Sequence, residues 1–166
     1  MLSDHVIAYV ALGANLGDPV ATVRTAIEAL HGITGTRFLI ASSLYRTAPV
    51  GLRDQPDFIN AVAALEVDDA VLPAPTFLEK LFAIEATFGR VRSIRNAPRT
   101  LDLDLLLFGT ERFASNGLTL PHPRLTERAF VLAPLVEIAP KLVIDGRGRA
   151  ADLLAGVADQ RIERLC

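Results

Sequence analysis

The chain has little cysteine and no long apolar run, and each absence excludes a class of protein. Cys166 is the single cysteine among 166 residues, so the chain can form neither an internal disulfide nor a thiolate metal site. No stretch of the sequence approaches the roughly 20 apolar residues that a membrane helix needs. No basic segment followed by an apolar run marks a signal peptide near the start. We therefore expect a cytoplasmic protein that makes no membrane contact.

The chain also lacks a strong charge of either sign. Seventeen Lys and Arg residues against 19 Asp and Glu residues give a net charge of −2. This balance provides no overall attraction to nucleic acid or to an anionic membrane, so any anion binding must be local. A length of 166 residues and a hydrophobic content of 51% suffice for one globular core. We expect a single domain over residues 1–166.

Strand and helix signals alternate along the first half of the chain. An apolar strand is predicted over 6–12, and a helix follows, with Asp18 as its N-cap and Pro19 at its first position. Further strands are expected over 36–45 and 58–67. Because strands and helices interleave without strict βαβ regularity, the pattern favours a one-domain α+β sandwich.

Three further helices are predicted from local signals. Thr76 and Glu79 have the spacing of a capping box, which predicts a helix that ends at Gly89. The segment 128–138 is predicted to be helical in part, with Pro134 as the first residue of a short helix. A small helix is expected to finish the chain.

Two aspartates stand at alternate positions in the apolar segment 101–107. Side chains alternate between the faces of a strand, so Asp102 and Asp104 point the same way, with Cα atoms roughly 6.6 Å apart. Four leucines are expected on the opposite face: Leu101, Leu103, Leu105 and Leu107. Paired carboxylates against an apolar sheet are costly without a cation, and Mg²⁺ both satisfies them and recruits phosphate oxygens.

The loop before this strand is basic and contains no acidic residue. Its arginines are Arg90, Arg92, Arg95 and Arg99. An acid pair beside such a loop favours a metal–polyphosphate site. The acid pair alone is equally consistent with a structural charge network, in which Arg99 and another arginine neutralise the carboxylates.

Other candidate binding residues are weaker signals when each is taken alone. Phe58 and Asn60 share one strand face, where a ring could stack on a flat heterocycle and an amide could read its edge. Phe58 alone fits a core position better. His122, between two prolines, could donate to a phosphate or bind metal, although a lone histidine in a turn is more often structural. Arg128 and Phe130 place a cation near a second ring.

Taken together, five segments closely resemble the 6-hydroxymethyl-7,8-dihydropterin pyrophosphokinase family of the folate pathway, over nearly the whole chain. They are Gly13-Ala14-Asn15-Leu16-Gly17, Ser43-Leu44-Tyr45-Arg46-Thr47, Asp54-Gln55-Pro56-Asp57-Phe58-Ile59-Asn60, Pro98-Arg99-Thr100-Leu101-Asp102-Leu103-Asp104 and Leu120-Pro121-His122-Pro123. The resemblance implies a ferredoxin-like, three-layer sandwich with a central, mainly antiparallel sheet. It also implies an enzyme that transfers pyrophosphate from ATP to the hydroxymethyl group of the dihydropterin and releases AMP. We expect the enzyme to be a monomer.

The resemblance assigns the residues of the transfer itself. On that basis Asp102 and Asp104 hold two Mg²⁺ ions that bridge the ATP phosphates, and Arg90 and Arg99 are the catalytic arginines. ATP would be the co-substrate, and the remaining nucleotide contacts would be Glu85, Arg92, Arg99, Thr119, His122 and Arg128.

The resemblance also assigns the pterin site. The pterin would stack between Phe58 and Phe130, while Asn60 and the backbone around Thr47 and Val50 read its edge. Phe58 stands where the family often has tyrosine. In addition, Phe82 replaces a polar nucleotide contact of some members, which bears on ATP affinity more than on the reaction.

Two other functions fit parts of the same sequence. A Mg²⁺-dependent phosphohydrolase or nuclease could use Asp102 and Asp104, and it would consume nucleotide without any pterin. A non-catalytic nucleic-acid-binding module could use the arginine loop. The acidic net charge and the lack of interleaved surface aromatics disfavour that module, and we expect no nucleic-acid partner.

Overall fold

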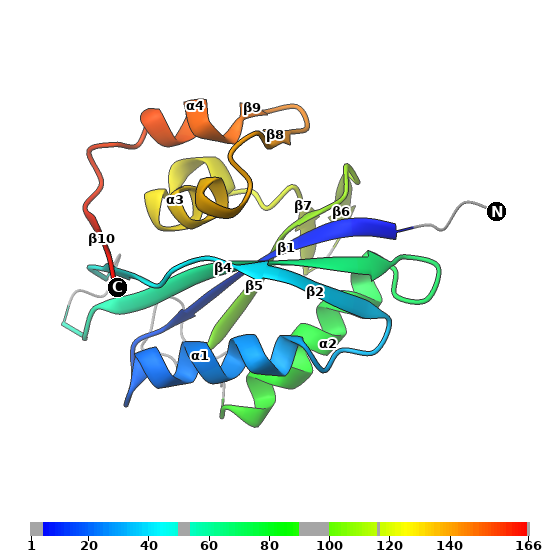
Figure 1. The fold of residues 1–166 in the computed structure, drawn as a ribbon, viewed down its shortest axis with the longest axis horizontal. Coiled ribbons are helices and arrows are strands. Elements are labelled where there is room, and N and C mark those ends of the chain that lie inside the picture. Colours follow the sequence, from blue (N-terminus) through cyan, green and yellow to red (C-terminus); the bar gives the residue numbers. More distant parts are fainter. Residues whose placement is uncertain (1–4, 50–53, 90–99, 116, 166) are drawn as a thin grey trace.

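The protein has three layers, with a central sheet between two pairs of helices (Figure 1). The computed structural model describes residues 5–49, 54–89, 100–115 and 117–165. Helices α1 and α2 cover one face of the sheet, and α3 and α4 lie over the other face (Figure 1). The α+β sandwich expected from the sequence is confirmed.

The central sheet has six strands, and every pair in it is antiparallel. The strand order is β10-β3-β4-β1-β5, and β2 also pairs with β4. Their bounds are β1 His5–Ala14, β2 Thr36–Ala41, β3 Tyr45–Thr47, β4 Phe58–Asp68, β5 Asp102–Phe108 and β10 Ile162–Arg164. The strands β1 and β4 therefore occupy the middle, and β5 lies at one edge of the sheet.

Helices and short hairpins join these strands. The helices are α1 Pro19–Leu30, α2 Ala74–Thr87, the 3₁₀ helix η1 Leu125–Glu127, α3 Ala129–Ile138 and α4 Ala150–Ala155. Two small hairpins pair β6 Phe113–Ser115 with β7 Leu118–Leu120, and β8 Val143–Ile144 with β9 Gly148–Arg149. Asp18 caps α1 as predicted, because its Oδ1 accepts the N–H of Ala21 at 3.2 Å.

Apolar side chains form a separate cluster on each face of the sheet. One cluster joins β1, β4 and β5 to α1 and α2, and it includes Leu12, Leu65 and Phe77. The other joins the sheet to α3 and α4, and it includes Val62 and Leu132. Because β4 contributes to both clusters, its sequence reads as a continuous apolar run rather than an alternating one.

Two helix predictions fail at prolines. The capping box predicted at Thr76 and Glu79 is wrong: α2 begins at Ala74 with Pro73 at its N-cap and no side-chain cap. Prolines fit the first turn of a helix, so the chain becomes helical three residues earlier. Pro134 does not begin a helix but lies inside α3. Its missing N–H removes one helical hydrogen bond, and the burial of α3 between the sheet and α4 compensates for that loss.

The single strand predicted over 36–45 is in fact two strands. The hydroxyl of Ser42 accepts the N–H of Val62 at 2.9 Å, in a place where the ladder would use a backbone carbonyl. The next N–H, from Ser43, leaves the sheet and donates to the carboxylate of Glu137 at 2.9 Å. Side-chain hydrogen bonds of this kind interrupt regular pairing, so β2 ends at Ala41 and β3 starts at Tyr45.

A bulge in β5 corrects the face expected for Leu107. The register passes from Tyr9 opposite Leu107 to Val10 opposite Leu105, so Leu106 is an extra residue. Leu101, Leu103 and Leu105 pack toward α1 and α2 as predicted, whereas Leu106 and Leu107 join the other cluster. A bulge shifts the alternation of side chains by one position, and sequence alternation alone does not reveal it. The chain also ends in strand β10 after α4, rather than in the small helix alone.

Truncation of a core leucine tests this packing. Leu81→Ala on α2 removes a fully buried side chain (0% exposed), and we expect the free energy of unfolding to fall by about 2–5 kcal/mol. Leu39→Ala is the matched control at 37% exposure, with an expected loss below about 1 kcal/mol. Urea unfolding measures both, and equal losses would contradict the assigned core.

Candidate active site

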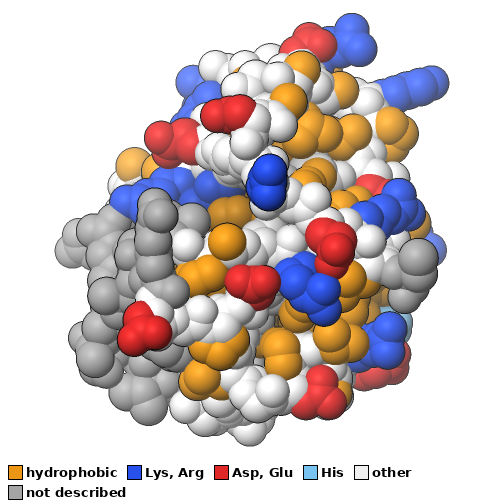
Figure 2. Space-filling view, turned by 90° about the vertical axis from the view of Figure 1, so that its left-hand side faces the viewer, with side chains coloured by type: hydrophobic (Ala, Val, Ile, Leu, Met, Phe, Trp, Pro, Cys, Tyr) orange, Lys and Arg blue, Asp and Glu red, His pale blue; other side chains and the backbone are white. Residues whose placement is uncertain are grey.

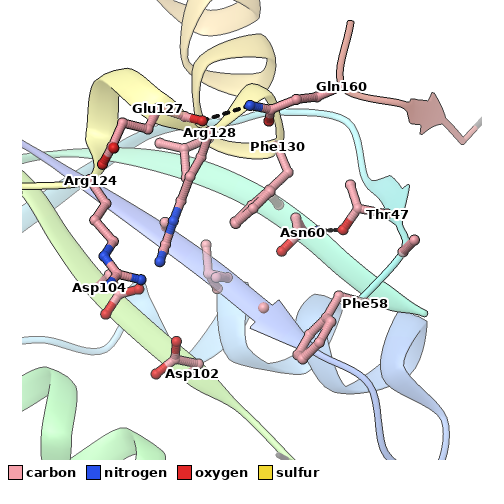
Figure 3. Close-up of a pocket in the computed structure, with 16 residues that line it drawn as sticks. Thr47, Phe58, Asn60, Asp102, Asp104, Arg124, Glu127, Arg128, Phe130 and Gln160 are labelled. Atoms are coloured by element: carbon pink, nitrogen blue, oxygen red, sulfur yellow. Dashed lines mark hydrogen bonds between the residues drawn. The ribbon is translucent and has the colours of Figure 1, made fainter. Parts of the chain in front are cut away.

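A cavity of about 400 Å³ lies between the sheet and the segment that leads into α3. Strands β1, β3, β4 and β5 form its floor, and residues of η1 and α3 form its roof (Figure 3). Its polar and aromatic lining residues are Thr47, Phe58, Asn60, Asp102, Asp104, Arg124, Glu127, Arg128, Phe130 and Gln160. Cavities of this size accommodate small organic ligands.

One end of this cavity combines aromatic rings with a fixed amide. Phe130 reaches down from α3 while Phe58 lies on the sheet below it, with Asn60 near both (Figure 3). The Asn60 Nδ2 donates to Thr47 Oγ1 at 2.8 Å, and this bond sets the orientation of the amide. Gly13 lies opposite Asn60 across the strands, and a Cβ there would approach Asn60 Oδ1 to 3.1 Å. Glycine at position 13 therefore leaves room for the amide.

The other end of the cavity is charged. Asp102 and Asp104 project from β5 on the same face, as their alternation predicts, and both line the cavity. Arg124 and Arg128 extend toward this end from the roof (Figure 3). Arg128 also lies 5.4 Å from the ring centroid of Phe130, within cation–π range, so it connects the charged end to the aromatic end.

A second cavity, of about 260 Å³, adjoins the first at Asp104. Leu78 and Phe82 of α2 line one side of it, and Thr119 and His122 line the other. The carboxylate of Asp104 borders both spaces. Two ligands held in these cavities would therefore meet beside β5.

His122 is held as a neutral side chain at the second cavity. Its Nδ1 accepts the N–H of Arg124 at 3.2 Å, so the remaining ring nitrogen carries the proton and can donate. Burial, and then the positive charge of Arg128, lowers the pKa of His122 to about 4, although Asp102 opposes the shift. The imidazole is thus a hydrogen-bond donor at neutral pH and carries no charge.

Glu85 of α2 forms a hydrogen bond to the backbone of β5. The residue is 1% exposed, and its Oε2 accepts the N–H of Leu103 at 2.7 Å. It lines neither cavity. Because Leu103 stands between the two aspartates, this bond fixes the part of the strand that presents them.

A carboxylate also ties the roof of the first cavity to its floor. Glu137, near the end of α3, accepts hydrogen bonds from Ser43 N, Ser43 Oγ and Tyr45 Oη, the last at 2.7 Å, and it pairs with Arg164 at 3.3 Å. Burial would raise the pKa of Glu137, but these donors hold it below its ordinary value. Burial, and then the bond to Glu137, raises the pKa of Tyr45 to about 12. Strands β3 and β10 are therefore anchored to α3.

The donor set at the charged end suits a hard cation that keeps other ligands. Within the described ranges, no cluster of three or more His, Cys, Asp or Glu residues could enclose a metal ion. Asp102 and Asp104 provide two carboxylates, and Mg²⁺ is often bound by one or two carboxylates together with waters and substrate phosphates. The two residues therefore fit Mg²⁺ bound together with a phosphorylated substrate.

The chain is similar to known proteins over most of its length. The family described as 7,8-dihydro-6-hydroxymethylpterin-pyrophosphokinase (HPPK) matches residues 9–140. The 2-amino-4-hydroxy-6-hydroxymethyldihydropteridine pyrophosphokinase of Pseudomonas aeruginosa is 44% identical over 157 residues, which span 95% of each chain. The Haemophilus influenzae protein of the same description is 40% identical over 160 residues, which span 96% of this chain and 98% of that protein.

The chain belongs to the HPPK family. It is accordingly an enzyme of the pyrophosphokinase class, as its sequence motifs predicted. Its place in folate biosynthesis follows from the family, which includes a Schizosaccharomyces pombe relative described as a folic acid synthesis protein, 40% identical over 137 residues.

Solved structures share the fold of this HPPK family member. The Plasmodium falciparum HPPK-DHPS structure with pterin and p-hydroxybenzoate has a TM-score of 0.72 at 14% identity. The match covers 95% of this chain and 44% of that longer chain. The ferredoxin-like, three-layer fold expected from the sequence is therefore confirmed.

Most of the predicted site residues that fall in the described ranges lie together in the structure. Seven line the first cavity: Thr47, Phe58, Asn60, Asp102, Asp104, Arg128 and Phe130. Thr119 and His122 line the second cavity, whereas Glu85 lies apart under β5. The remaining predicted residues lie outside the described part of the chain: Val50, Arg90, Arg92 and Arg99.

Three polar lining residues of the first cavity were not predicted as site residues. Arg124 and Glu127 lie between His122 and Arg128 in the sequence. Because both of those residues were predicted to bind ATP, the charged residues between them could have been predicted as well. Gln160 lies far along the chain and belongs to no motif, so only the tertiary structure brings it to the site.

In the part of the chain that the structure describes, no helix has the length and apolar character needed to cross a membrane.

The pKa of His122 makes stability depend on pH. Because the folded pKa is about 4 and the ordinary value is 6.5, the unfolded chain takes up a proton first as pH falls. We expect this histidine's contribution to stability to be present above pH 6.5 and to be lost progressively as pH falls toward 4.

Urea unfolding without metal or nucleotide measures this effect. The loss of stability between pH 6.5 and 4 should be smaller in His122→Asn, whose amide oxygen can still accept the N–H of Arg124. His31→Asn is the control at an exposed histidine. Equal losses in the wild type and His122→Asn would contradict a buried neutral imidazole.

Proposed function

We propose that this enzyme transfers pyrophosphate from ATP to the hydroxymethyl group of 6-hydroxymethyl-7,8-dihydropterin and releases AMP. The observation that carries the proposal is the meeting of two cavities at Asp104. A transfer between two bound substrates requires such neighbouring sites, whereas hydrolysis of one nucleotide requires a single site.

The first cavity supports pterin binding at its aromatic end. A flat bicycle would stack between Phe58 and Phe130, and the Asn60 amide, held by Thr47, would read its polar edge. In this orientation the hydroxymethyl group would point toward Asp102 and Asp104. Val50 belongs to the same proposed site by resemblance.

The second cavity supports nucleotide binding. Its apolar side, with Leu78 and Phe82, suits an adenine ring, and the neutral His122 and the Thr119 hydroxyl are donors for phosphate oxygens. The triphosphate would then extend past Asp104 into the first cavity, where Arg124 and Arg128 lie. Glu85 and Arg92 remain proposed nucleotide contacts by resemblance.

Asp102 and Asp104 are the residues that would hold two Mg²⁺ ions, which would neutralise phosphate charge and assist both the attacking and the leaving oxygen. The hydroxymethyl oxygen would form a bond to the β-phosphorus, the bond to the oxygen that bridges the α- and β-phosphorus atoms would break, and the alcohol proton would pass to water. Arg128, with Arg90 and Arg99 by resemblance, would stabilise charge on the transferred group. Such reactions depend mainly on positioning and electrostatics, so the chain needs no dedicated base.

The same proposal includes the broader properties of the protein. We propose that residues 1–166 form one domain, that the enzyme acts as a monomer in the cytoplasm, and that it binds neither nucleic acid nor membrane. Acidic and basic side chains are interspersed on the face shown in Figure 2, which supports the absence of a nucleic-acid surface there.

A product assay tests the reaction. Purified protein, Mg²⁺, ATP and the dihydropterin should give AMP and the pterin diphosphate in equal amounts, and only when both substrates are present. ADP or phosphate formed without pterin would instead support a phosphohydrolase or nuclease that uses the two aspartates.

Removal of one carboxylate should abolish the transfer and leave the fold intact. We expect Asp102→Asn and Asp104→Asn each to lower kcat by about 10²-fold or more, because each removes a charge that holds the metal. The unfolding midpoint in urea should stay near the wild-type value. Asp152→Asn on α4, where the carboxylate is exposed, is the matched control. Turnover near the wild-type rate in either strand variant would exclude the metal assignment.

The Asn60 amide should determine pterin affinity. Asn60→Asp keeps the shape but replaces the Nδ2 donor with an oxygen in a buried position (6% exposed), and we expect the pterin KM to rise by roughly tenfold or more. The ATP KM serves as the internal control and should stay within about twofold. A parallel rise in both KM values would show that Asn60 acts on the fold rather than on the pterin.

A further inference from the structure

The segment after α4 returns to the cavity from outside the region that matches the family. That region ends at residue 140, whereas Gln160 lies between α4 and β10. Gln160 reaches the roof of the cavity beside Glu127, Arg128 and Phe130 (Figure 3).

Gln160 replaces a helix cap that the local sequence does not provide. Arg128 occupies the N-cap position of α3, and its side chain makes no capping bond. The N-cap position favours Ser, Thr, Asp or Asn, because their oxygens accept the first free N–H groups of the helix, and arginine has no acceptor. Instead Gln160 Oε1 accepts the N–H of Ala129 at 2.9 Å.

The same side chain makes a second bond on the other side of Arg128. Gln160 Nε2 donates to the carbonyl of Glu127 at 2.8 Å. One amide thus holds the backbone both before and after Arg128, in the manner of a two-point clamp. Rotation of this short segment would change the direction of the Arg128 side chain.

Arg128 and Phe130 depend on this segment for their place in the cavity. The Arg128 guanidinium lies 5.4 Å from the Phe130 ring centroid, and both side chains line the cavity. Val131 N and Leu132 N also donate to the carbonyl of Arg128, at 3.1 and 3.0 Å, so the first turn of α3 starts from the clamped residue. A shift at Arg128 would therefore be transmitted to Phe130.

We propose that Gln160 is a positioning residue that sets Arg128 and Phe130 for the bound pterin. This inference rests on the proposed function, because it concerns the same heteroaromatic substrate. Gln160 acts through the backbone of 127–129, so its loss affects the fraction of molecules in which the roof is correctly placed. The role predicts a rise in the pterin KM relative to the ATP KM, which a loss of stability alone would not produce.

The test compares Gln160→Met with the wild type. Methionine keeps the length of the side chain and removes both hydrogen bonds. We expect the pterin KM, and the Kd for pterin measured by quenching of its fluorescence, to rise roughly fivefold, as expected for the loss of one net hydrogen bond. The ATP KM should rise less than the pterin KM, because Phe130 lies at the proposed pterin end alone, whereas Arg128 is one of several proposed nucleotide contacts. Arg161→Gln is the matched control, since Arg161 is exposed and lines neither cavity.

A second variant separates the clamp from simple stability. Gln160→Glu retains the acceptor for Ala129 and loses only the donor to Glu127, so it should fold even if Gln160→Met does not. At pH 7 its pterin Kd should rise, and it should fall back toward the wild-type value at a pH low enough to protonate the new carboxyl, which can then donate again. A role in stability alone would lower the unfolding midpoint and leave the ratio of pterin KM to ATP KM unchanged.

Two failures are distinguishable. If the proposed function is wrong, the wild-type enzyme itself will form no pterin diphosphate. If only the positioning role is wrong, the wild type will be active, and the Gln160 variants will bind pterin within twofold of it.

Discussion

A hydrogen bond from the backbone of β5 to a buried carboxylate holds the strand on which the whole site depends. Strand β5 is at the edge of the sheet and, among the described strands, pairs only with β1. The side chain of Glu85, which lies on α2, accepts the N–H of Leu103 at 2.7 Å. It thereby satisfies one of the backbone polar groups at the outer edge of β5, on the side without a neighbouring strand. A buried polar group is costly unless it is hydrogen-bonded, so this bond links α2 to the strand. Asp102 and Asp104 flank this point on the opposite face.

The other walls of the site are fixed to β5 through the sheet and through α3. Strand β1 separates β5 from β4, which carries Phe58 and Asn60, so the register of two antiparallel pairs sets the distance between the acid pair and the amide. Glu137 anchors α3 to Ser43 and Tyr45, and Gln160 holds the backbone on both sides of Arg128. These hydrogen bonds therefore fix the position of the cavity roof, while the apolar clusters contribute most of the free energy of folding.

Local patterns predicted some of the elements that depend on local chemistry, although the capping box at Thr76 was wrong. The alternation of Asp102 and Asp104 and the cap at Asp18 required only neighbouring residues, and both are confirmed. The bulge at Leu106 could not be predicted, because it depends on how β5 pairs with β1. Gln160 was missed for a similar reason: a glutamine that caps a helix 31 residues away has no local signature. Motif resemblance identified the family because several short segments, most of them weak alone, occur in the order that the family has.

The most direct measurement is a crystal structure of the enzyme with the dihydropterin, a non-hydrolysable ATP analogue and Mn²⁺ in place of Mg²⁺. Anomalous scattering locates Mn²⁺ without reference to the refined atoms. We expect anomalous peaks beside the carboxylates of both Asp102 and Asp104, with the pterin between Phe58 and Phe130 and the nucleotide in the cavity beside His122. Peaks elsewhere with both aspartates free of metal, or a pterin bound outside the first cavity, would contradict the assignment.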